Sequence, residues 1–486
     1  MRLKGFIGPT YALASQNIEA QRTVNCYPEI DELHTAADGE IGSLVSTPGS
    51  RLLATLGTGP IRGMYVTSDA KTFIVVSGKQ VFSVKKDWTS TLVGVIGSTT
   101  GSVGIADNGK QICIVDGKGG YIITLETMAT KAPNAVITIT SDGFSGATNV
   151  VFQDGYFIFN KPDSGQFYIS ALYDGLTEDA LDFASAEGSP DNLVTLLTCR
   201  RQVWLLGGKT IEVWWDSGAA DFPFSRYDGA FIEYGCVAPW SAVVFANQVL
   251  WLGGGPDGDG IVWMAQGFQP TRISNHAVEY AIQKCGDVSL ATSYVYQHNG
   301  HMFYCLNLPN SATTWVYDLS TQQWHERAYL GTDGQFQRHR GDCYAWAFST
   351  DVIGDYQNGN IYALDDTYHT DNGNPIKGVR RSPYVSADML RTFHIKLEVA
   401  ALMGVGLDGT TAPGTAPSLV LRYSDDFGHT WSNERVRALG QLGQYRNRCY
   451  WDRLGSTRTR IYEISWTDPV QVVLQGAEIA ITSGGN

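Results

Sequence analysis

The sequence predicts an all-β fold whose central part is a β-propeller. The chain holds 54 glycines among 486 residues, and 12% of its residues are aromatic. Glycine weakens helix interiors and supplies positive φ in turns, whereas aromatic side chains favour strands. Between residues 61 and 385, short β-branched or aromatic runs alternate with Gly, Asn and Asp turns, a pattern typical of β-hairpins.

These hairpins recur at roughly 40–50 residues, which is the length of a four-stranded propeller blade. Their ranges and turn residues are 73–84 (Ser77-Gly78-Lys79), 105–114 (Asn108-Gly109), 150–159 (Asp154-Gly155), 203–215 (Gly207-Gly208), 242–252 (Asn247), 294–306 (Asn299-Gly300) and 356–364 (Asn358-Gly359). The turn residues need not occupy equivalent positions in their hairpins, so their spacing gives only an approximate repeat length. The segment has room for six or seven blades, and we expect about six. A stacked or sandwich all-β fold would contain the same hairpins and is the alternative.

The two ends of the chain differ from the middle. Residues 1–60 are rich in turn signals, and residues 386–486 combine a Gly, Thr, Ala and Pro-rich loop (404–417) with alternating strand-like runs. We therefore divide the chain into an N-terminal segment (1–60), a propeller (61–385) and a C-terminal β domain (386–486). The chain ends are expected to form an additional β unit.

Charge and cysteine content exclude several classes of protein. A net charge of −13 disfavours a sequence-specific DNA reader or a membrane-surface binder, unless basic residues cluster locally. The eight cysteines are scattered without any C-x-x-C pair, which indicates buried, reduced thiols made in a reducing cytoplasm. The longest nearly apolar stretch, 397–407, is too short for a membrane helix, so no membrane insertion is expected.

The most specific short motif is an Asp-box, S-x-D-x-G-x-T-W, formed by Ser424, Asp426, Gly428, Thr430 and Trp431. Its Asp carboxylate and hydroxyls suit the N–H groups of a hairpin turn, and its Gly suits a positive φ. We interpret it as a structural turn. The alternative is a sialidase-like glycosidase, which would need an acid and a nucleophile set against the sugar. The sequence supplies no such pair, so no catalytic residue, cofactor or metal site is assigned.

Eight arginines cluster between residues 422 and 460, interleaved with Tyr445, Tyr450 and Trp451. Arginine and aromatic residues are enriched at protein interfaces. We expect an interface that includes Arg435, Arg437, Arg446, Arg448, Trp451 and Arg453. A nucleic-acid groove is the alternative, although neighbouring residues such as Asp425, Glu434 and Asp452 partly offset the positive charge.

Longer stretches carry a resemblance to a known family. The stretches are 21–29 (QRTVNCYPE) with Thr47-Pro48-Gly49, 221–226 (DFPFSR) running into 235–239 (GCVAP), and the C-terminal 423–431, 443–455 and 468–470. In this order they resemble the packaged-DNA stabilisation, or tail nozzle, proteins of short-tailed bacteriophages. The resemblance spans nearly the whole chain.

The resemblance implies a structural virion protein, synthesised in the host cytoplasm and placed in the virion tail. Such a protein is a non-enzymatic head-completion subunit that closes the portal channel, retains packaged DNA and forms part of the conduit for ejection. Its implied partners are its own copies in a homohexameric ring, the portal-adaptor ring contacted by residues 1–60, and a tail needle or plug or tail fibres or spikes. DNA would pass without sequence-specific binding. A glycan-binding or sialidase-like propeller and a small-molecule-binding propeller are the rival functions.

Overall fold

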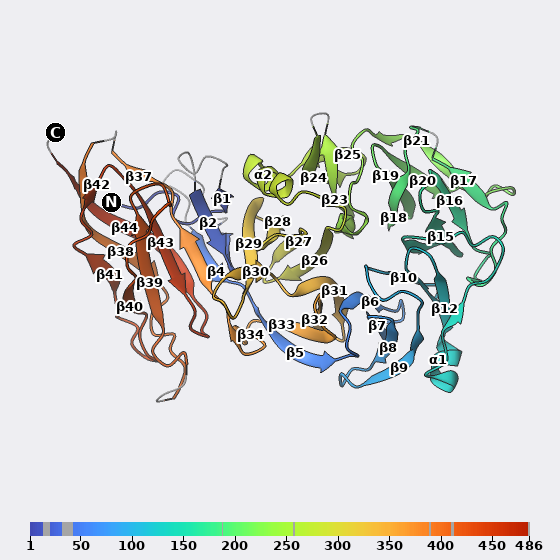
Figure 1. Cartoon of the computed structure of the whole chain (residues 1–486), viewed down its shortest axis with the longest axis horizontal. Helices are drawn as coiled ribbons and strands as arrows, with labels where there is room; N and C mark the ends of the chain where they lie inside the picture. Colours follow the sequence, from blue (N-terminus) through green and yellow to red (C-terminus); the bar gives the residue numbers. More distant parts are fainter. Residues whose placement is uncertain are drawn as a thin grey trace.

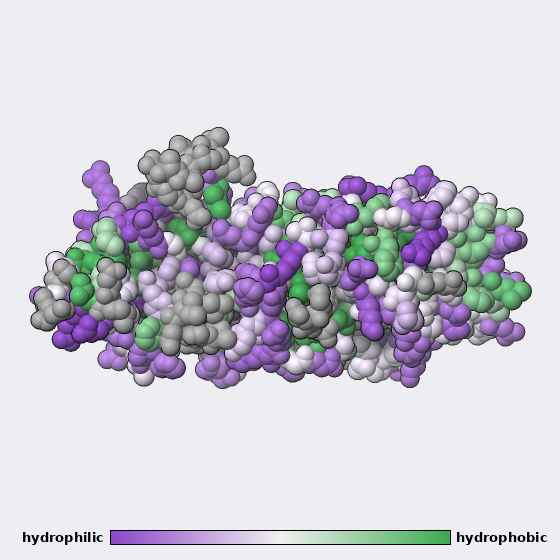
Figure 2. All heavy atoms as spheres, turned by 90° about the horizontal axis from the view of Figure 1, so that it is seen from above, coloured by the Kyte–Doolittle hydropathy of each residue, from purple (hydrophilic) through white to green (hydrophobic). Residues whose placement is uncertain are grey.

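The molecule is elongated (Figures 1 and 2), with a β-propeller at one end and a β-sandwich at the other (Figure 1). The structure, a computed structural model, describes residues 1–12, 20–31, 42–186, 188–255, 258–387, 390–409 and 413–484. The all-β prediction is confirmed, and so is the combination of a propeller with a second β unit built from both chain ends.

Within the described residues, seven four-stranded units form the propeller, each running outward from its innermost strand. Blade 1 contains β6 (Ile61–Val66), β7 (Phe73–Ser77), β8 (Gln80–Val84) and β9 (Ser90–Val95); blade 2 contains β10 (Gly104–Asp107), β11 (Gln111–Val115), β12 (Gly120–Thr124) and β13 (Ile137–Thr138); blade 3 contains β14 (Val150–Gln153), β15 (Tyr156–Asn160), β16 (Gln166–Ile169) and β17 (Phe183–Ser185). Blade 4 contains β18 (Leu193–Cys199), β19 (Gln202–Gly207), β20 (Ile211–Asp216) and β21 (Phe224–Ile232); blade 5 contains β22 (Val243–Phe245), β23 (Gln248–Gly255), β24 (Gly258–Gln266) and β25 (Gln269–Arg272); blade 6 contains β26 (Thr292–His298), β27 (His301–Asn307), β28 (Thr314–Asp318) and β29 (Gln323–Leu330).

Blade 7 closes the ring with strands from two distant parts of the chain. Its inner strands are β31 (Gly341–Ala347), β32 (Thr350–Asp355) and β33 (Asn360–Asp365), and its fourth strand is β5 (Gly49–Thr55). The blade count is therefore seven, whereas the sequence predicted about six. The difference arises because β5 precedes residue 61 and pairs with a strand about three hundred residues later, a relationship that no local pattern reveals.

The turns between the first two strands of blades 3 and 6 follow the predicted chemistry. Asp154 and Gly155 both have positive φ (49° and 99°), as do Asn299 and Gly300 (48° and 83°). Two consecutive positive φ values define the tight hairpin turn that matches strand twist, and Asn-Gly or Asp-Gly favours it. The hairpin predicted at 356–364 is displaced, because β32 ends at Asp355 and residues 356–359 form the turn itself.

The apolar cores lie between adjacent blades. One cluster between blades 5 and 6 contains Leu252, Tyr304, Trp315 and Trp324, and equivalent clusters fill the other gaps. All eight cysteines are free; six are buried as predicted, while Cys285 and Cys343 are partly exposed. In the part of the chain that the structure describes, two short α-helices form connections, α1 (Leu125–Lys131) within blade 2 and α2 (His276–Lys284) between blades 5 and 6, and a 3₁₀ helix, η1 (Pro239–Ser241), precedes blade 5.

The sandwich packs two sheets around one core. One sheet has the order β3 (Cys26–Ile30), β4 (Gly42–Ser46), β44 (Val473–Ser483), β38 (Thr392–Ala401) and β41 (Cys449–Asp452). The other runs β2 (Ala20–Val24), β36 (Gly378–Arg381), β43 (Thr459–Trp466), β39 (Ser418–Ser424) and β40 (Arg435–Ala438). Short flanking strands are β1 (Tyr11–Ala12), β30 (Phe336–Arg338), β34 (Thr370–Asp371), β35 (Asn374–Pro375), β37 (Val385–Ser386) and β42 (Ser456–Thr457). The segment before residue 61 is thus shared between the sandwich and blade 7.

Candidate functional site

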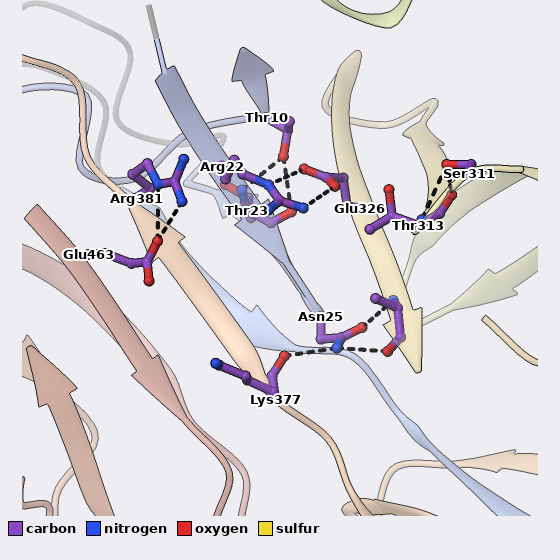
Figure 3. Close-up of polar contacts among 11 residues, drawn as sticks. Thr10, Arg22, Thr23, Asn25, Ser311, Thr313, Glu326, Lys377, Arg381 and Glu463 are labelled. Carbon is purple, nitrogen blue, oxygen red and sulfur yellow. Dashed lines mark hydrogen bonds and ion pairs between the residues drawn. The ribbon is translucent and has the colours of Figure 1, made fainter. Parts of the chain in front are cut away.

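The junction between propeller and sandwich is a continuous sheet with a buried ion pair. Strand β2 of the sandwich lies parallel to β29, the outer strand of blade 6, through the pair Val24 and Glu326. Beside it, Arg22 donates from Nε and Nη2 to the two carboxylate oxygens of Glu326 at 3.0 and 2.6 Å (Figure 3). Burial alone raises the pKa of Glu326, but the charge and hydrogen bonds of Arg22 hold it below its ordinary value.

Asn25 ties three segments together at the lower end of this junction. Its Nδ2 donates to the carbonyls of Ala328 and Lys377, both at 2.9 Å, and its Oδ1 accepts from the Ala328 N–H at 2.8 Å (Figure 3). Asn25 has a φ of 56°, a conformation that Asn tolerates better than most residues. One buried side chain therefore fixes the position of β2 relative to both blade 6 and β36.

A second charged cluster lies one strand further into the sandwich. Glu463 on β43 accepts hydrogen bonds from Arg381 at 2.8 Å and from Arg422 at 2.6 Å. Both guanidinium groups also lie 4.7 Å from the ring centre of Trp431. Burial raises the pKa of Glu463, but the two arginines outweigh it and lower the pKa below its ordinary range. The Trp of the Asp-box thus joins a buried ionic cluster, a role that its sequence pattern does not indicate.

The Asp-box forms a self-contained turn between β39 and β40. Asp426 accepts from the Ser424 hydroxyl at 2.7 Å, from the Thr430 N–H at 2.8 Å and from the Thr430 hydroxyl at 2.5 Å. The Ser424 hydroxyl accepts from the N–H of Gly428, whose φ is +90°. Hydrogen bonds from Thr430, first among the causes, lower the pKa of Asp426 to about 2. Every fixed position of the motif serves the turn or the cluster beneath it.

The arginine-rich segment divides into anchored and exposed residues. Arg448 makes a two-point ion pair with Glu398 at 2.7 Å, while Arg435 and Arg437 donate to the backbone carbonyls of Asp452 and Tyr450. Trp451 is fully buried and donates to the Arg435 carbonyl, so its expected place on a contact surface must be corrected. Side chains alternate between the two faces of β41, so Trp451 points into the sandwich core, whereas Tyr450 faces outward.

Arg446 and Arg453 project from the surface of the sandwich. Both are exposed, Arg446 in the loop before β41 and Arg453 directly after that strand. Arg460, which belongs to the same cluster in the sequence, is 1% exposed and forms a two-point pair with Asp425 at 2.6 and 2.7 Å. The cluster is therefore partly a structural network, and its available positive charge is smaller than the sequence suggests.

A cavity of about 560 Å³ lies on the propeller face that carries the connections between blades. Its walls hold both signs of charge, with Arg62 and Arg338 beside Asp116 and Asp342. Arg62 donates to the carbonyls of Gly78, Ser98, Gly101 and Thr100, so it braces these connecting loops.

Within the described residues there is no group of three or more His, Cys, Asp or Glu side chains that could hold a metal ion. Across the same described ranges, no helix has the length and apolarity needed to cross a bilayer.

Comparisons with known proteins agree with both halves of this architecture. A family described as bacteriophage P22 Gp10, β-propeller, matches residues 17–369, and one described as bacteriophage P22 Gp10, β-sandwich, matches residues 379–482. Comparison with individual curated proteins gave no significant match.

Similar solved structures include the WD40 propeller domain of Doa1, with 13% identity, a TM-score of 0.42, and coverage of 66% of this chain and 98% of that one. The propeller domain of Myceliophteria thermophila Cps50 (Swd1) has 7% identity, a TM-score of 0.40, and coverage of 65% and 98%. The extracellular domain of the putative hybrid two-component system BT4673 of B. thetaiotaomicron has 9% identity, a TM-score of 0.44, and coverage of 87% and 61%.

Proposed function

Because this chain belongs to the bacteriophage P22 Gp10 family of tail nozzle and packaged-DNA stabilisation proteins, we propose that it closes the portal channel of its virion, retains the packaged DNA and later forms part of the conduit for ejection. One observation supports this most directly. The propeller and sandwich families both match this chain, one after the other, and the two matched parts form a propeller and a sandwich joined by a buried junction. It is a structural protein of the virion tail.

The rigidity of the junction suits a subunit that must resist pressure from packaged DNA. The Arg22–Glu326 pair and the two hydrogen bonds between Asn25 and Ala328 bridge the domains directly, and the Glu326 and Asn25 side chains are buried. Charge-assisted, two-point hydrogen bonds fix orientation as well as distance. A force applied to the propeller would therefore pass into the sandwich without a flexible linker to absorb it.

The proposed partners are further copies of this chain in a homohexameric ring, the adaptor ring below the portal, and a tail needle or plug or tail fibres or spikes. We assign residues 1–60 with the sandwich to the adaptor side and the exposed arginines Arg446 and Arg453 to a contact with a neighbouring subunit or tail protein. A net charge of −13 suits a conduit, because a wall that attracted phosphates would retard DNA. No enzymatic step, cofactor or membrane insertion forms part of this function, and synthesis in the host cytoplasm is consistent with it.

The test uses DNA-filled heads that carry portal and adaptor but lack this protein. Purified protein should bind to them, appear as a six-fold ring in electron micrographs, and slow the loss of DNA measured as sensitivity to added DNase. An unchanged rate of DNA loss at saturating binding would contradict the proposal. Turnover of a sialylated glycan by the same preparation, abolished by replacing a single carboxylate, would favour the glycosidase alternative instead.

A further inference from the structure

The opposite face of the propeller holds a second and larger cavity. Its volume is about 820 Å³, within the range of roughly 300–1,000 Å³ that ligand sites occupy. Its walls come from the innermost strands of three successive blades, β22, β26 and β31, together with the loop after β33. This is the face that carries the β22–β23, β26–β27 and β31–β32 turns, and it is separate from the domain junction.

Aromatic and apolar side chains form one side of this cavity. Trp346 on β31 is 56% exposed, an unusual position for a tryptophan on an innermost strand. Phe245 and the neighbouring valines Val243 and Val244, all on β22, also line the cavity. An uncovered indole at the edge of a concave site offers a flat face to a ligand that is cationic or apolar.

Carboxylates lie beside this aromatic surface. Asp351 on β32 lies directly opposite Trp346 in the strand register, so both side chains stand on the same face of the sheet. The Tyr344 hydroxyl donates to Asp351 Oδ1 at 2.7 Å. Asp366 lies nearby, 2.6 Å from Nε2 of His298, and accepts from the Asn299 amide at 3.3 Å.

No lysine or arginine occurs among the described residues that line this cavity. Burial raises the pKa of Asp351, and His298 is the positively chargeable group that faces it, while Asp366 adds a like charge. The site therefore presents negative charge that is partly removed from water, with a tyrosine hydroxyl, a histidine and an asparagine amide as its partners. A bound cation would offset the negative charge of these carboxylates, whereas an anion would be repelled by it.

We propose that this cavity binds an arginine or lysine side chain carried by an extended segment of a partner protein. The cationic head would lie between the Trp346 ring and the Asp351 and Asp366 carboxylates, and apolar neighbours in the segment would cover Phe245. A guanidinium or ammonium group adds Coulomb attraction to its hydrogen bonds with these carboxylates, and a neutral sugar hydroxyl does not, so a cation is favoured over a glycan. The volume exceeds one side chain, which favours a peptide over a free amine.

The test observes Trp346 directly in the full-length protein. Labelling with 5-fluorotryptophan gives one fluorine NMR resonance per tryptophan, and the resonance missing from Trp346→Phe identifies Trp346. The probes are acetyl-Leu-Arg-Leu-amide, its citrulline counterpart, which has the same shape without the charge, and maltohexaose as a neutral glycan. We expect a saturable shift of the Trp346 resonance with the arginine peptide and at least tenfold weaker binding of the citrulline peptide.

Two variants test the aromatic and the carboxylate parts of the site, with binding measured by isothermal titration calorimetry because Trp346→Ala removes the reporter resonance. Asp351→Asn and Trp346→Ala should each weaken binding of the arginine peptide at least tenfold, whereas Asp333→Asn, at an exposed turn after β29, should leave it unchanged. The other tryptophan resonances report whether each variant is folded. Equal binding of arginine and citrulline peptides, or no saturable shift with the arginine peptide, would overturn the proposal. Selective binding of maltohexaose would overturn it in favour of a glycan site.

Discussion

Arg22 and Glu326 stand 304 positions apart in the sequence and meet through hydrogen bonds of 3.0 and 2.6 Å at the boundary between sandwich and propeller. The Glu326 side chain is only 5% exposed, so its charge depends on Arg22 for compensation. This pair makes the junction a specific contact rather than a hinge, and it provides the first test of the architecture.

We expect Arg22→Ala to lower the free energy of unfolding by about 3 kcal/mol, because it leaves a buried carboxylate without its partner. Arg51→Ala is the matched control. The Arg51 side chain is 49% exposed in its pair with Asp365, and loss of such a pair changes stability by about 1 kcal/mol or less. Denaturant unfolding of both variants checks the prediction, and equal losses would show that the junction pair adds no more than a surface pair.

Asp426→Ala should loosen the β39–β40 hairpin without removing any chemical step. The carboxylate accepts the three hydrogen bonds that close the turn. Hydrogen–deuterium exchange should become faster in peptides covering β39 and β40 and stay unchanged in the propeller. Asp333→Ala, which removes an acceptor for the Gln335 N–H in a turn after β29, is the control and should leave the sandwich unaffected. Unaltered exchange together with loss of a catalytic rate would contradict the structural interpretation.

The sandwich should lose stability on mild acidification through His394. This residue is 2% exposed, and its Nδ1 lies 2.6 Å from the Tyr462 hydroxyl. Burial, followed by the charge of Arg460, lowers the pKa of His394 from 6.5 to about 4. Between these values the unfolded chain binds a proton that the folded chain does not, so the stability present above pH 6.5 falls as the pH drops towards 4.

At pH 5 this linkage amounts to about 2 kcal/mol. The loss of stability between pH 7 and pH 5 should therefore be smaller by about this amount in His394→Gln than in the wild type. His276, whose side chain is 75% exposed, provides the control, because His276→Gln should retain the wild-type difference. An identical pH dependence in all three proteins would show that His394 titrates alike in the folded and unfolded chains.

The exposed arginines of the sandwich should serve attachment rather than DNA binding. Arg446→Gln and Arg453→Gln together remove two exposed positive charges while leaving the anchored pair Arg448–Glu398 intact. We expect normal folding, weaker attachment to the tail and greater leakage of DNA from filled heads. Arg201→Gln, at an 84% exposed side chain on the propeller, is the matched control and should behave as wild type.

A titration with duplex DNA at several salt concentrations distinguishes a protein interface from a nucleic-acid groove. Free protein should bind DNA weakly at physiological salt whether or not these arginines are present. Tight wild-type binding with a steep salt dependence that flattens in the double variant would mean that Arg446 and Arg453 contact phosphates. The interface assignment would then be wrong.

The sequence predicted local structure well where the chemistry of the turn is local. Asn299-Gly300 and Asp154-Gly155 adopt positive φ at both positions, as their residue types favour. The same turn occurs at Arg200-Arg201 and at Phe348-Ser349, with φ between 52° and 63° at these four residues. Neither pair carries a Gly or Asn signal. At these two turns the pairing of the flanking strands imposes the conformation against the local preference of the residues. Turn residues therefore do not mark every hairpin, and the blade repeat is harder to detect in the sequence.

By itself, the sequence determined the all-β class, the propeller, the additional β unit and the Asp-box turn, because alternation, turn residues and short motifs act over a few neighbouring positions. Only the tertiary structure decided that β5 completes a seventh blade, that Trp451 and Arg460 are buried, and that Arg22 meets Glu326. The same holds for Trp346 and Asp351, which become one wall of a cavity only when three blades converge. These relationships depend on contacts between distant segments, whose energies are set by burial and charge pairing in the folded chain, and no local pattern encodes them.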